Sequence, residues 1–283
     1  MTKLQQISIA GGSGHLGTCL IKLLLDQNFS VKALYKNHLP RINHPNLTWI
    51  KGDVTNKECI EQLMENTSIL VHSAGIISIG EKKRDVVYNT NVHGTEVIIK
   101  ACSNKNIRLI YISSSNAVKE TKNNDVFDEN RPYKTKRDFL YGYTKSLSEQ
   151  NILKAVNIKN LDAIILRPTS IIGPPDFMPS YFGQTILDMH NGQIPALTTG
   201  GYNLVNPKRK TIIIPLDLLI FLSPLIYVFN KVYKMRWPFT RESLIILKKA
   251  PKNVDSSKAM KTLNHKIRPT QNTVEDLITW FKA

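Results

Sequence analysis

A glycine-rich turn between a short apolar strand and a helix, near the start of the chain, constrains the fold most. Leu4 to Ala10 has the composition of a buried strand, and Gly11-Gly12-Ser13-Gly14-His15-Leu16-Gly17 follows it directly. His15 to Gln27 then shows helical spacing, with its leucines gathered on one side. A strand, a tight turn and a helix in this order predict the first unit of a parallel sheet.

The same alternation of strands and helices continues to residue 167. The fold class we predict is therefore α/β, a doubly wound parallel sheet (Rossmann) with helices on both faces. Prolines cluster after Pro168, which indicates that the chain leaves the sheet for a small, loop-rich lobe. The further strands are predicted at 29–35, 47–51, 68–72, 108–113 and 162–167, and the helices at 56–65, 82–102, 138–156 and 273–281.

Composition excludes several classes of protein and leaves a globular one. Of the 283 residues 42% are hydrophobic and 21% are charged, which excludes a disordered, collagenous or coiled-coil chain. The cysteines, Cys19, Cys59 and Cys102, lie far apart without a C-x-x-C pair, so we expect neither a disulfide framework nor a zinc site. A reducing compartment fits this pattern. No signal peptide precedes the first strand, and we expect a cytoplasmic location.

The net charge of +16 favours anionic ligands, nucleic acid or anionic membranes. No basic block reaches the length of a nucleic-acid-binding tail, so we expect a lysine-rich solvated surface and no nucleic-acid partner. The phosphates of a cofactor would suit the same charge.

One apolar stretch, from Thr211 to Phe229, is long enough to raise the question of a membrane. A spanning helix needs about 20 mostly apolar residues. Asp217 lies within the stretch, and Pro215 and Pro224 interrupt it. We therefore expect a buried or peripheral helix, and contact with a membrane stays the alternative.

The glycine turn has the spacing of a dinucleotide site. Glycines at 11, 14 and 17 allow a tight turn, close approach of a pyrophosphate and close packing of helix on strand. An NAD site would place an acidic residue near the end of the second strand, yet none occurs before Asp53. Lys36 occupies that neighbourhood and suits a 2′-phosphate. We predict NADP, with NAD and a merely solvated Lys36 as alternatives.

Tyr141 and Lys145 form a Tyr-x-x-x-Lys pattern in the helix predicted at 138–156. Residues four apart share one face of a helix, so both side chains are expected at the same place. A free tyrosine has a pKa of about 10, and a nearby ammonium pulls that pKa towards neutrality. Ser113-Ser114-Ser115 ends the fifth strand, at the edge where doubly wound sheets place their sites. The set predicts a proton-transfer site, although a Tyr-Lys pair alone also occurs on plain surface helices.

Together these features resemble the extended short-chain dehydrogenase/reductase family, the NAD(P)-dependent epimerase/dehydratase group. Hydroxysteroid-dehydrogenase-like and dihydroflavonol-reductase-like members look closest. The matching motifs occur in the family's order over nearly the whole chain: Gly11 to Gly17, Gly52-Asp53-Val54, Val71 to Gly75, Asn91 to Thr95, Tyr111 to Ser115, Leu166 to Thr169, Asp255 to Ala259 and Trp280-Phe281.

The resemblance implies a role for each matching residue. Tyr141 would exchange a proton with the substrate oxygen, and Lys145 would assist it and hold the nicotinamide ribose. Ser114 would hydrogen-bond the reacting carbonyl or alcohol, with Ser115 as its substitute. The cofactor-binding residues given by the loop and the resemblance are Gly11, Gly14, His15, Leu16, Gly17, Lys36, Asp53, Val54, Ala74, Gly75, Lys145 and Pro168.

The chain departs from the family pattern after Val205. In the family pattern residues 200–205 would lead into a further helix and strand, but Asn206 to Lys210 follow directly, so a few tens of residues of that pattern are absent here. A shortened lobe and a sequence that omits a segment both fit this gap. We predict a dinucleotide-binding domain at 1–167 and a substrate lobe at 168–283, shortened near 205–210.

The function predicted is an NAD(P)-dependent oxidoreductase that moves a hydride to or from a hydroxyl or carbonyl of a small organic substrate. A nucleotide-sugar epimerase or dehydratase would use the same residues. A non-catalytic NAD(P)-binding regulator is a third reading, disfavoured because Tyr141 and Lys145 are both present. A homodimer is compatible with each of them.

Overall fold

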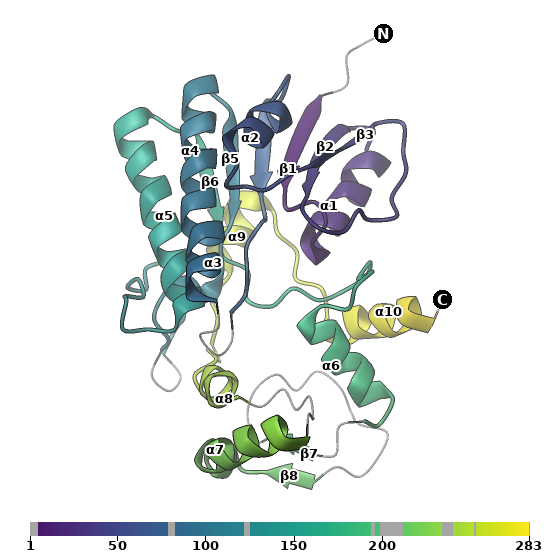
Figure 1. The fold of residues 1–283 in the computed structure, drawn as a ribbon, viewed down its shortest axis with the longest axis vertical. Coiled ribbons are helices and arrows are strands. Elements are labelled where there is room, and N and C mark those ends of the chain that lie inside the picture. Colours follow the sequence, from purple (N-terminus) through teal and green to yellow (C-terminus); the bar gives the residue numbers. More distant parts are fainter. Residues whose placement is uncertain are drawn as a thin grey trace. The chain divides into compact units, whose positions relative to one another are not determined.

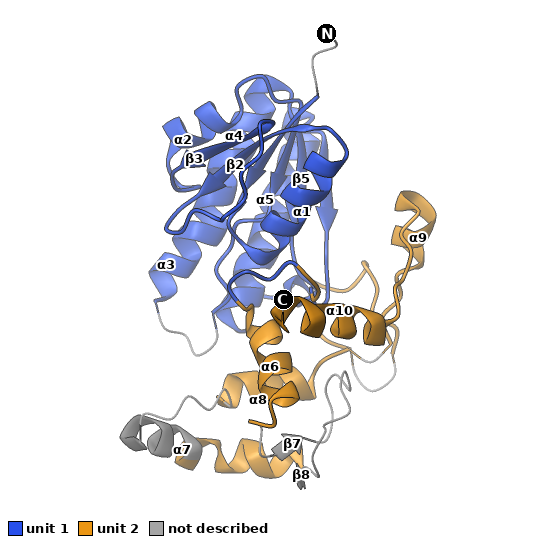
Figure 2. Cartoon of the chain, turned by 90° about the vertical axis from the view of Figure 1, so that its right-hand side faces the viewer, with its two compact units in different colours: residues 1–118, 133–171, 175–178 blue, residues 119–132, 172–174, 179–283 orange. Residues whose placement is uncertain are grey.

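The computed structural model describes residues 5–78, 83–121, 125–193, 196–198, 212–233, 240–251 and 253–282. The stretch at 199–211, where the family pattern breaks off, lies outside them. The chain divides into two compact units (Figure 2). Unit 1 comprises residues 1–118, 133–171 and 175–178, and unit 2 the remainder. The domain boundary predicted between residues 167 and 168 stays a prediction.

Unit 1 is built on one six-stranded, fully parallel sheet with the order β3-β2-β1-β4-β5-β6. Because the strand order reverses between β1 and β4, the crevice where such sheets bind ligands lies at the carboxyl ends of those two strands. The doubly wound α/β prediction is confirmed. The strands are β1 (Gln6–Ala10), β2 (Ser30–Tyr35), β3 (Leu47–Lys51), β4 (Ile69–His72), β5 (Arg108–Ile112) and β6 (Ala163–Leu166).

Helices cover both faces of this sheet (Figure 1). On one face lies α1 (His15–Asp26), where Ile21 packs with Ile9 of β1. On the other lie α2 (Lys57–Leu63), α4 (Gly94–Lys105) and α5 (Leu140–Lys159), whose apolar residues pack with Ala10. Adjacent residues of β1 thus enter opposite cores, as the alternation of side chains along a strand requires.

The helix predicted at 82–102 is interrupted by one irregular turn. Its described part consists of α3 (Arg84–Tyr88), a π-helical turn at Asn89–His93 and α4. The turn buries Asn91, whose Oδ1 accepts a hydrogen bond from Ile76 N at 2.8 Å. Such turns are rare in proteins, and those that occur are often found at functional sites.

Unit 2 consists of short elements around two small apolar clusters. In one, α6 (Tyr181–His190) packs on α10 (Thr270–Lys282) through Ile186, Val274 and Leu277, which confirms the predicted C-terminal amphipathic helix. In the other, Leu216 and Leu219 of α7 pack on Leu244 of α8. The remaining bounds are α7 (Leu216–Tyr233), α8 (Arg241–Lys248), α9 (Ser257–Leu263), β7 (Ala196–Thr198) and β8 (Ile212–Ile214).

The apolar stretch at 211–229 is split between β8 and α7. In the described part of α7, Leu216 and Leu219 are buried, whereas Leu218, Phe221 and Leu225 are exposed. Over the ranges that the structure covers, no helix combines the length and apolar character needed to cross a bilayer. A peripheral helix and a membrane contact both stay predictions.

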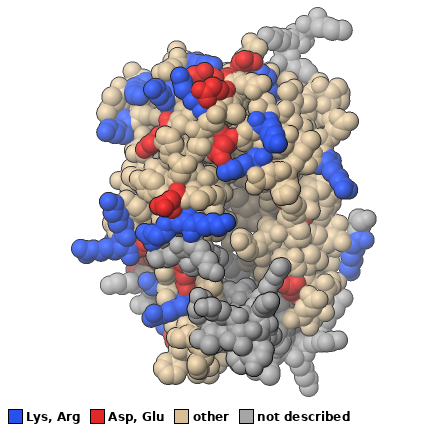
Figure 3. Space-filling view, viewed as in Figure 1, with Lys and Arg blue, Asp and Glu red and all other residues tan. Residues whose placement is uncertain are grey.

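Lys and Arg side chains lie in several separate groups on the face in Figure 3, with Asp and Glu among them. On this face the positive charge is therefore divided among several groups and mixed with negative charge, and the expected absence of a nucleic-acid partner stays a prediction.

Candidate active site

Two glycines of the turn after β1 are required by the fold itself. Gly11 has φ +97°, and a Cβ there would lie 2.5 Å from Ala74 N. A Cβ on Gly17 would lie 2.2 Å from the carbonyl oxygen of Gly11. Any side chain at either position would collide with backbone.

Gly14 differs, because the chain itself leaves room for a side chain there. Its φ of −79° suits any residue, and the nearest atom to a built Cβ is Gly11 O at 3.4 Å. Gly14 is also the N-cap residue of α1, and no side chain hydrogen-bonds to the N–H groups there. The first turn of α1 holds no acidic residue. His15, Leu16 and Gly17 form that first turn, whose N–H groups and dipole favour an anion. The residues present fit a pyrophosphate lying against Gly14.

The turn leads along the sheet edge to the predicted catalytic lysine. Ala74 packs against the α-carbon of Gly11. A Cβ built on the next residue, Gly75, would lie 3.4 Å from Lys145 Nζ. The carboxyl ends of β1 and β4 therefore carry small residues, Gly11, Gly14, Ala74 and Gly75, which we call the glycine cradle, next to Lys145 of α5. A side chain at position 75 would lie against Lys145 and Asn91.

Lys36 and Asp53, two predicted cofactor residues, bind each other. Lys36 Nζ lies 2.5 Å from Asp53 Oδ2, just beyond β2, and Thr55 N donates to Asp53 Oδ1 at 3.0 Å. Burial opposes ionisation of Asp53, but the hydrogen bonds from Lys36 and Thr55 outweigh it and lower its pKa. Lys36 was predicted to face a 2′-phosphate or solvent, whereas here it pairs with a carboxylate. Next to Asp53, Val54 is buried and contacts Gly94, so it also packs α4.

Ser114 and Tyr141 lie close enough for a hydrogen bond. Ser114 follows β5 and caps a short 3₁₀ turn, while Tyr141 lies in the first turn of α5. Burial raises the pKa of Tyr141, and a hydrogen bond with Ser114 lowers it in part. The direction is opposite to the shift towards neutrality that we expected from Lys145, because burial of the phenol dominates.

Lys145 is buried and faces the end of β5. Its Nζ donates to Ile112 O at 2.8 Å and lies 4.8 Å from the ring centroid of Tyr111. Burial lowers the pKa of Lys145 to about 8, and the nearby charge of Glu149 opposes that change. A lysine with this pKa can both hold and release a proton near neutral pH.

Ser115 and Pro168 lie at the neighbouring strand ends. Ser115 N donates to Pro168 O at 2.9 Å, which ties the loop after β5 to the residue that follows Arg167. Both residues are half-buried. That Pro168 contacts the cofactor and that Ser115 can replace Ser114 both stay predictions.

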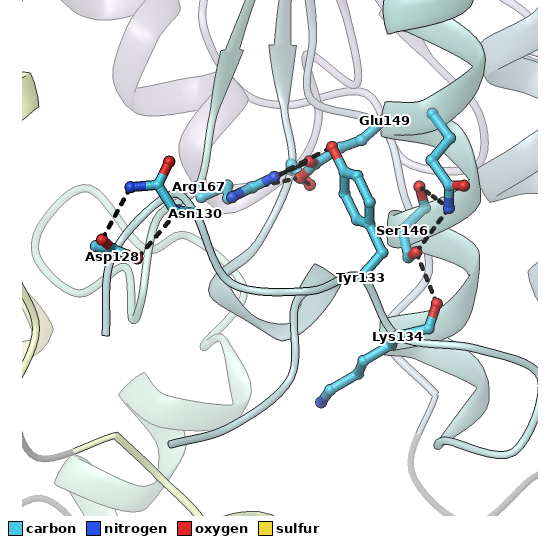
Figure 4. A network of polar contacts seen from close by, with 9 residues as sticks. Asp128, Asn130, Tyr133, Lys134, Ser146, Glu149 and Arg167 are labelled. Atoms are coloured by element: carbon cyan, nitrogen blue, oxygen red, sulfur yellow. Dashed lines mark hydrogen bonds and ion pairs between the residues drawn. The ribbon is translucent and has the colours of Figure 1, made fainter. Parts of the chain in front are cut away.

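Sequence reasoning missed a buried ionic cluster directly behind these residues (Figure 4). Its centre is Glu149, which contacts Ser113, Arg167 and, through Arg167, Tyr133. Glu149 follows Lys145 by four residues, so continuing the Tyr-Lys spacing by one more turn of α5 would have found it.

The sequence profile of the 3-beta hydroxysteroid dehydrogenase/isomerase family matches residues 8–197, more than half of the chain. The chain belongs to this family. The resemblance stated from the motifs is confirmed, and the matched range contains every proposed catalytic and cofactor-binding residue.

Curated proteins similar to this chain include ones named for sterol, dihydroflavonol and hydroxysteroid chemistry. Sterol demethylase protein B of Methylococcus capsulatus is 27% identical over 74% of this chain and 64% of its own length. A Synechocystis protein named for dihydroflavonol 4-reductase is 31% identical over 71% and 59%. The 3-beta-hydroxysteroid dehydrogenase of Mycolicibacterium neoaurum is 29% identical over 62% and 50%. The chain thus spans between half and two thirds of the length of these relatives.

Solved structures share the whole fold of this family member. The crystal structure of gox2253 has a TM-score of 0.79 at 23% identity, covering 98% of both chains. The Bordetella bronchiseptica enzyme WbmH, solved in complex with NAD+, has a TM-score of 0.71 at 16% identity, covering 99% of both. At these identities the likeness establishes the fold.

Proposed function

We propose that this protein is an NAD(P)-dependent oxidoreductase that interconverts a hydroxyl and a carbonyl on a small organic substrate. One observation carries the proposal: Ser114 contacts Tyr141, and the buried Lys145, on the same face of α5, borders the glycine cradle. Membership of a hydroxysteroid dehydrogenase family and the names of the relatives support it.

The cradle would hold the dinucleotide through its backbone. The first turn of α1 would bind the pyrophosphate, with Gly14 leaving the room that it needs. Ala74, Gly75, Lys145 and Pro168 would border the nicotinamide end, and Asp53 with Val54 the adenine end. For NADP, Lys36 would have to share its charge between Asp53 and the 2′-phosphate. The preference for NADP is accordingly smaller than a free lysine would give.

The site residues would handle the proton and the substrate oxygen. Because burial keeps Tyr141 protonated at neutral pH, its phenol can donate a proton to the oxygen of a carbonyl being reduced. Ser114 can hydrogen-bond the same oxygen, and Lys145 can stabilise the phenolate left behind. A bound nicotinamide would supply or accept the hydride.

The test measures cofactor binding and turnover separately. Calorimetry with NAD and NADP checks the cradle, and nicotinamide absorbance checks hydride transfer with hydroxysteroids, aromatic ketones and nucleotide sugars. A net absorbance change with a ketone or alcohol supports the oxidoreductase. Conversion of a nucleotide sugar without a net change would instead identify an epimerase. Tight cofactor binding without any turnover would identify a regulator. A homodimer and a cytoplasmic location stay predictions.

A further inference from the structure

Glu149 is fully buried in the middle of α5 and binds two strand ends at once (Figure 4). Arg167 Nε donates to Oε1 and Oε2 of Glu149 at 3.0 Å each, and Arg167 Nη2 donates to Oε2 at 2.6 Å. The Ser113 hydroxyl donates to Oε1. Arg167 Nη2 also reaches the Tyr133 hydroxyl at 3.2 Å, and its guanidinium lies 5.4 Å from that ring centroid.

The residues of this cluster are adjacent in sequence, or one helical turn away, from the residues proposed for the active site. Ser113 immediately precedes Ser114, and Arg167 immediately precedes Pro168. Glu149 is one turn of α5 beyond Lys145, which is one turn beyond Tyr141. A buried ion pair is costly, and apolar side chains could join a helix to a sheet at least as stably. A role beyond packing is therefore the better account of the cluster.

The charges around Lys145 point to what that role is. His72 of β4 is buried and kept neutral, with its pKa lowered to about 3 by burial and by Lys145. Tyr111 of β5 is kept neutral because burial raises its pKa. Arg167, which follows β6, is cationic, and the uncharged Asn91 comes from the π-helical turn. Among these described neighbours, Glu149 supplies the negative charge that favours a protonated Lys145.

We propose that Glu149 is a positioning residue: it fixes the ends of β5 and β6 against α5 and keeps Lys145 charged. Its contribution to the reaction rests on the proposed function, because it acts through Lys145 and Ser114. Its effect on the charge of Lys145 does not, and that effect can be measured in the protein without cofactor or substrate.

The first experiment measures the titration of Lys145 by NMR of lysine-labelled protein, with Lys145→Met to assign its signal. Glu149→Gln removes the carboxylate that pairs with Arg167 and is expected to lower the melting temperature. In Glu149→Gln, titrated below its melting temperature, the pKa of Lys145 should fall by about one unit or more, because an opposite charge within a helical turn is lost while the positive charge of Arg167 remains. The double variant Glu149→Gln/Arg167→Met removes both charges and should recover the fold, and its Lys145 pKa should fall less, because a neighbouring positive charge is lost as well. Glu149→Asp keeps the negative charge and should therefore keep the pKa of Lys145 close to its wild-type value.

Asp162→Asn is the matched control, because Asp162 also pairs with an arginine, Arg108 at 2.6 Å, but on the surface. It should leave Lys145 unchanged. Once a substrate is known, the alkaline limb of kcat/KM should move to lower pH in Glu149→Gln, alongside the NMR shift. An unchanged Lys145 titration in folded Glu149→Gln would overturn the proposal and leave Glu149 as a structural residue. Should the titration shift while no cofactor binds, the proposed function fails and the assignment of Glu149 stands.

Discussion

Replacing the buried Lys145 by methionine is expected to make this protein more stable at neutral pH. Burial lowers the pKa of Lys145 from its ordinary 10.5 to about 8. That difference corresponds to about 3 kcal/mol by which the folded state disfavours the charged lysine. Methionine also gives up the hydrogen bond to Ile112 O, which is worth about 1 kcal/mol. Lys145→Met should therefore raise the free energy of unfolding by about 2 kcal/mol at pH 7.

The pH dependence gives this prediction its sign. Below about pH 8 the lysine is charged in both states, and the full penalty applies. Between about pH 8 and 10.5 the folded protein has released the proton and the unfolded chain still holds it, so wild-type stability rises with pH. Lys145→Met should lack this rise.

Urea unfolding of both proteins from pH 7 to 10 measures this difference. Lys154→Met is the control, since Lys154 is exposed on the same helix and should change stability little. A Lys145→Met protein less stable than wild type at pH 7 would refute the reasoning. It would show that the ammonium gains more from its surroundings than burial costs it.

Three further predictions concern the site. Tyr141→Phe removes one hydroxyl and should lower turnover about 10²–10⁴-fold with cofactor affinity nearly unchanged; equal rates measured by nicotinamide absorbance would exclude Tyr141 as the acid. Gly14→Val should fold normally, because the chain leaves room there, yet lose cofactor affinity by calorimetry, whereas Gly17→Ala should destabilise the fold itself. Lys36→Glu should reduce the ratio of NADP to NAD affinity by placing repulsion at the 2′-phosphate; wild type binding NAD at least as well as NADP would contradict the predicted preference.

The sheet and the cofactor loop were predictable because they depend on local patterns. Short apolar runs mark the strands, and the spacing of Gly11, Gly14 and Gly17 places a turn between strand and helix. The Tyr-Lys pair could be placed on one face of α5 by helix geometry alone. In each case residues close in sequence decide the structure, so no knowledge of the tertiary fold is needed.

What the sequence did not predict depends on residues distant in the chain. Lys36 was assigned to a 2′-phosphate or to solvent because no acidic residue lies close to it in sequence, yet the fold brings Asp53 to it across the ends of β2 and β3. The pKa of Tyr141 was expected to be lowered by Lys145, but burial, a property of the whole fold, raises it. The partners of Glu149 are Ser113, just after β5, and Arg167, just after β6, which lie 36 and 18 residues away.

The positions of the buried ionisable side chains indicate where in this protein the active site lies. Away from the site the two sheet cores are apolar. At the ends of β4, β5 and β6 the fold instead buries a lysine, a glutamate and His72, whose Nδ1 has no hydrogen-bond partner among the described residues. Each of these groups costs stability that an apolar residue would not. Since marginally stable proteins keep such groups mainly where function needs them, this edge of the sheet, beside the glycine cradle, is where chemistry is expected.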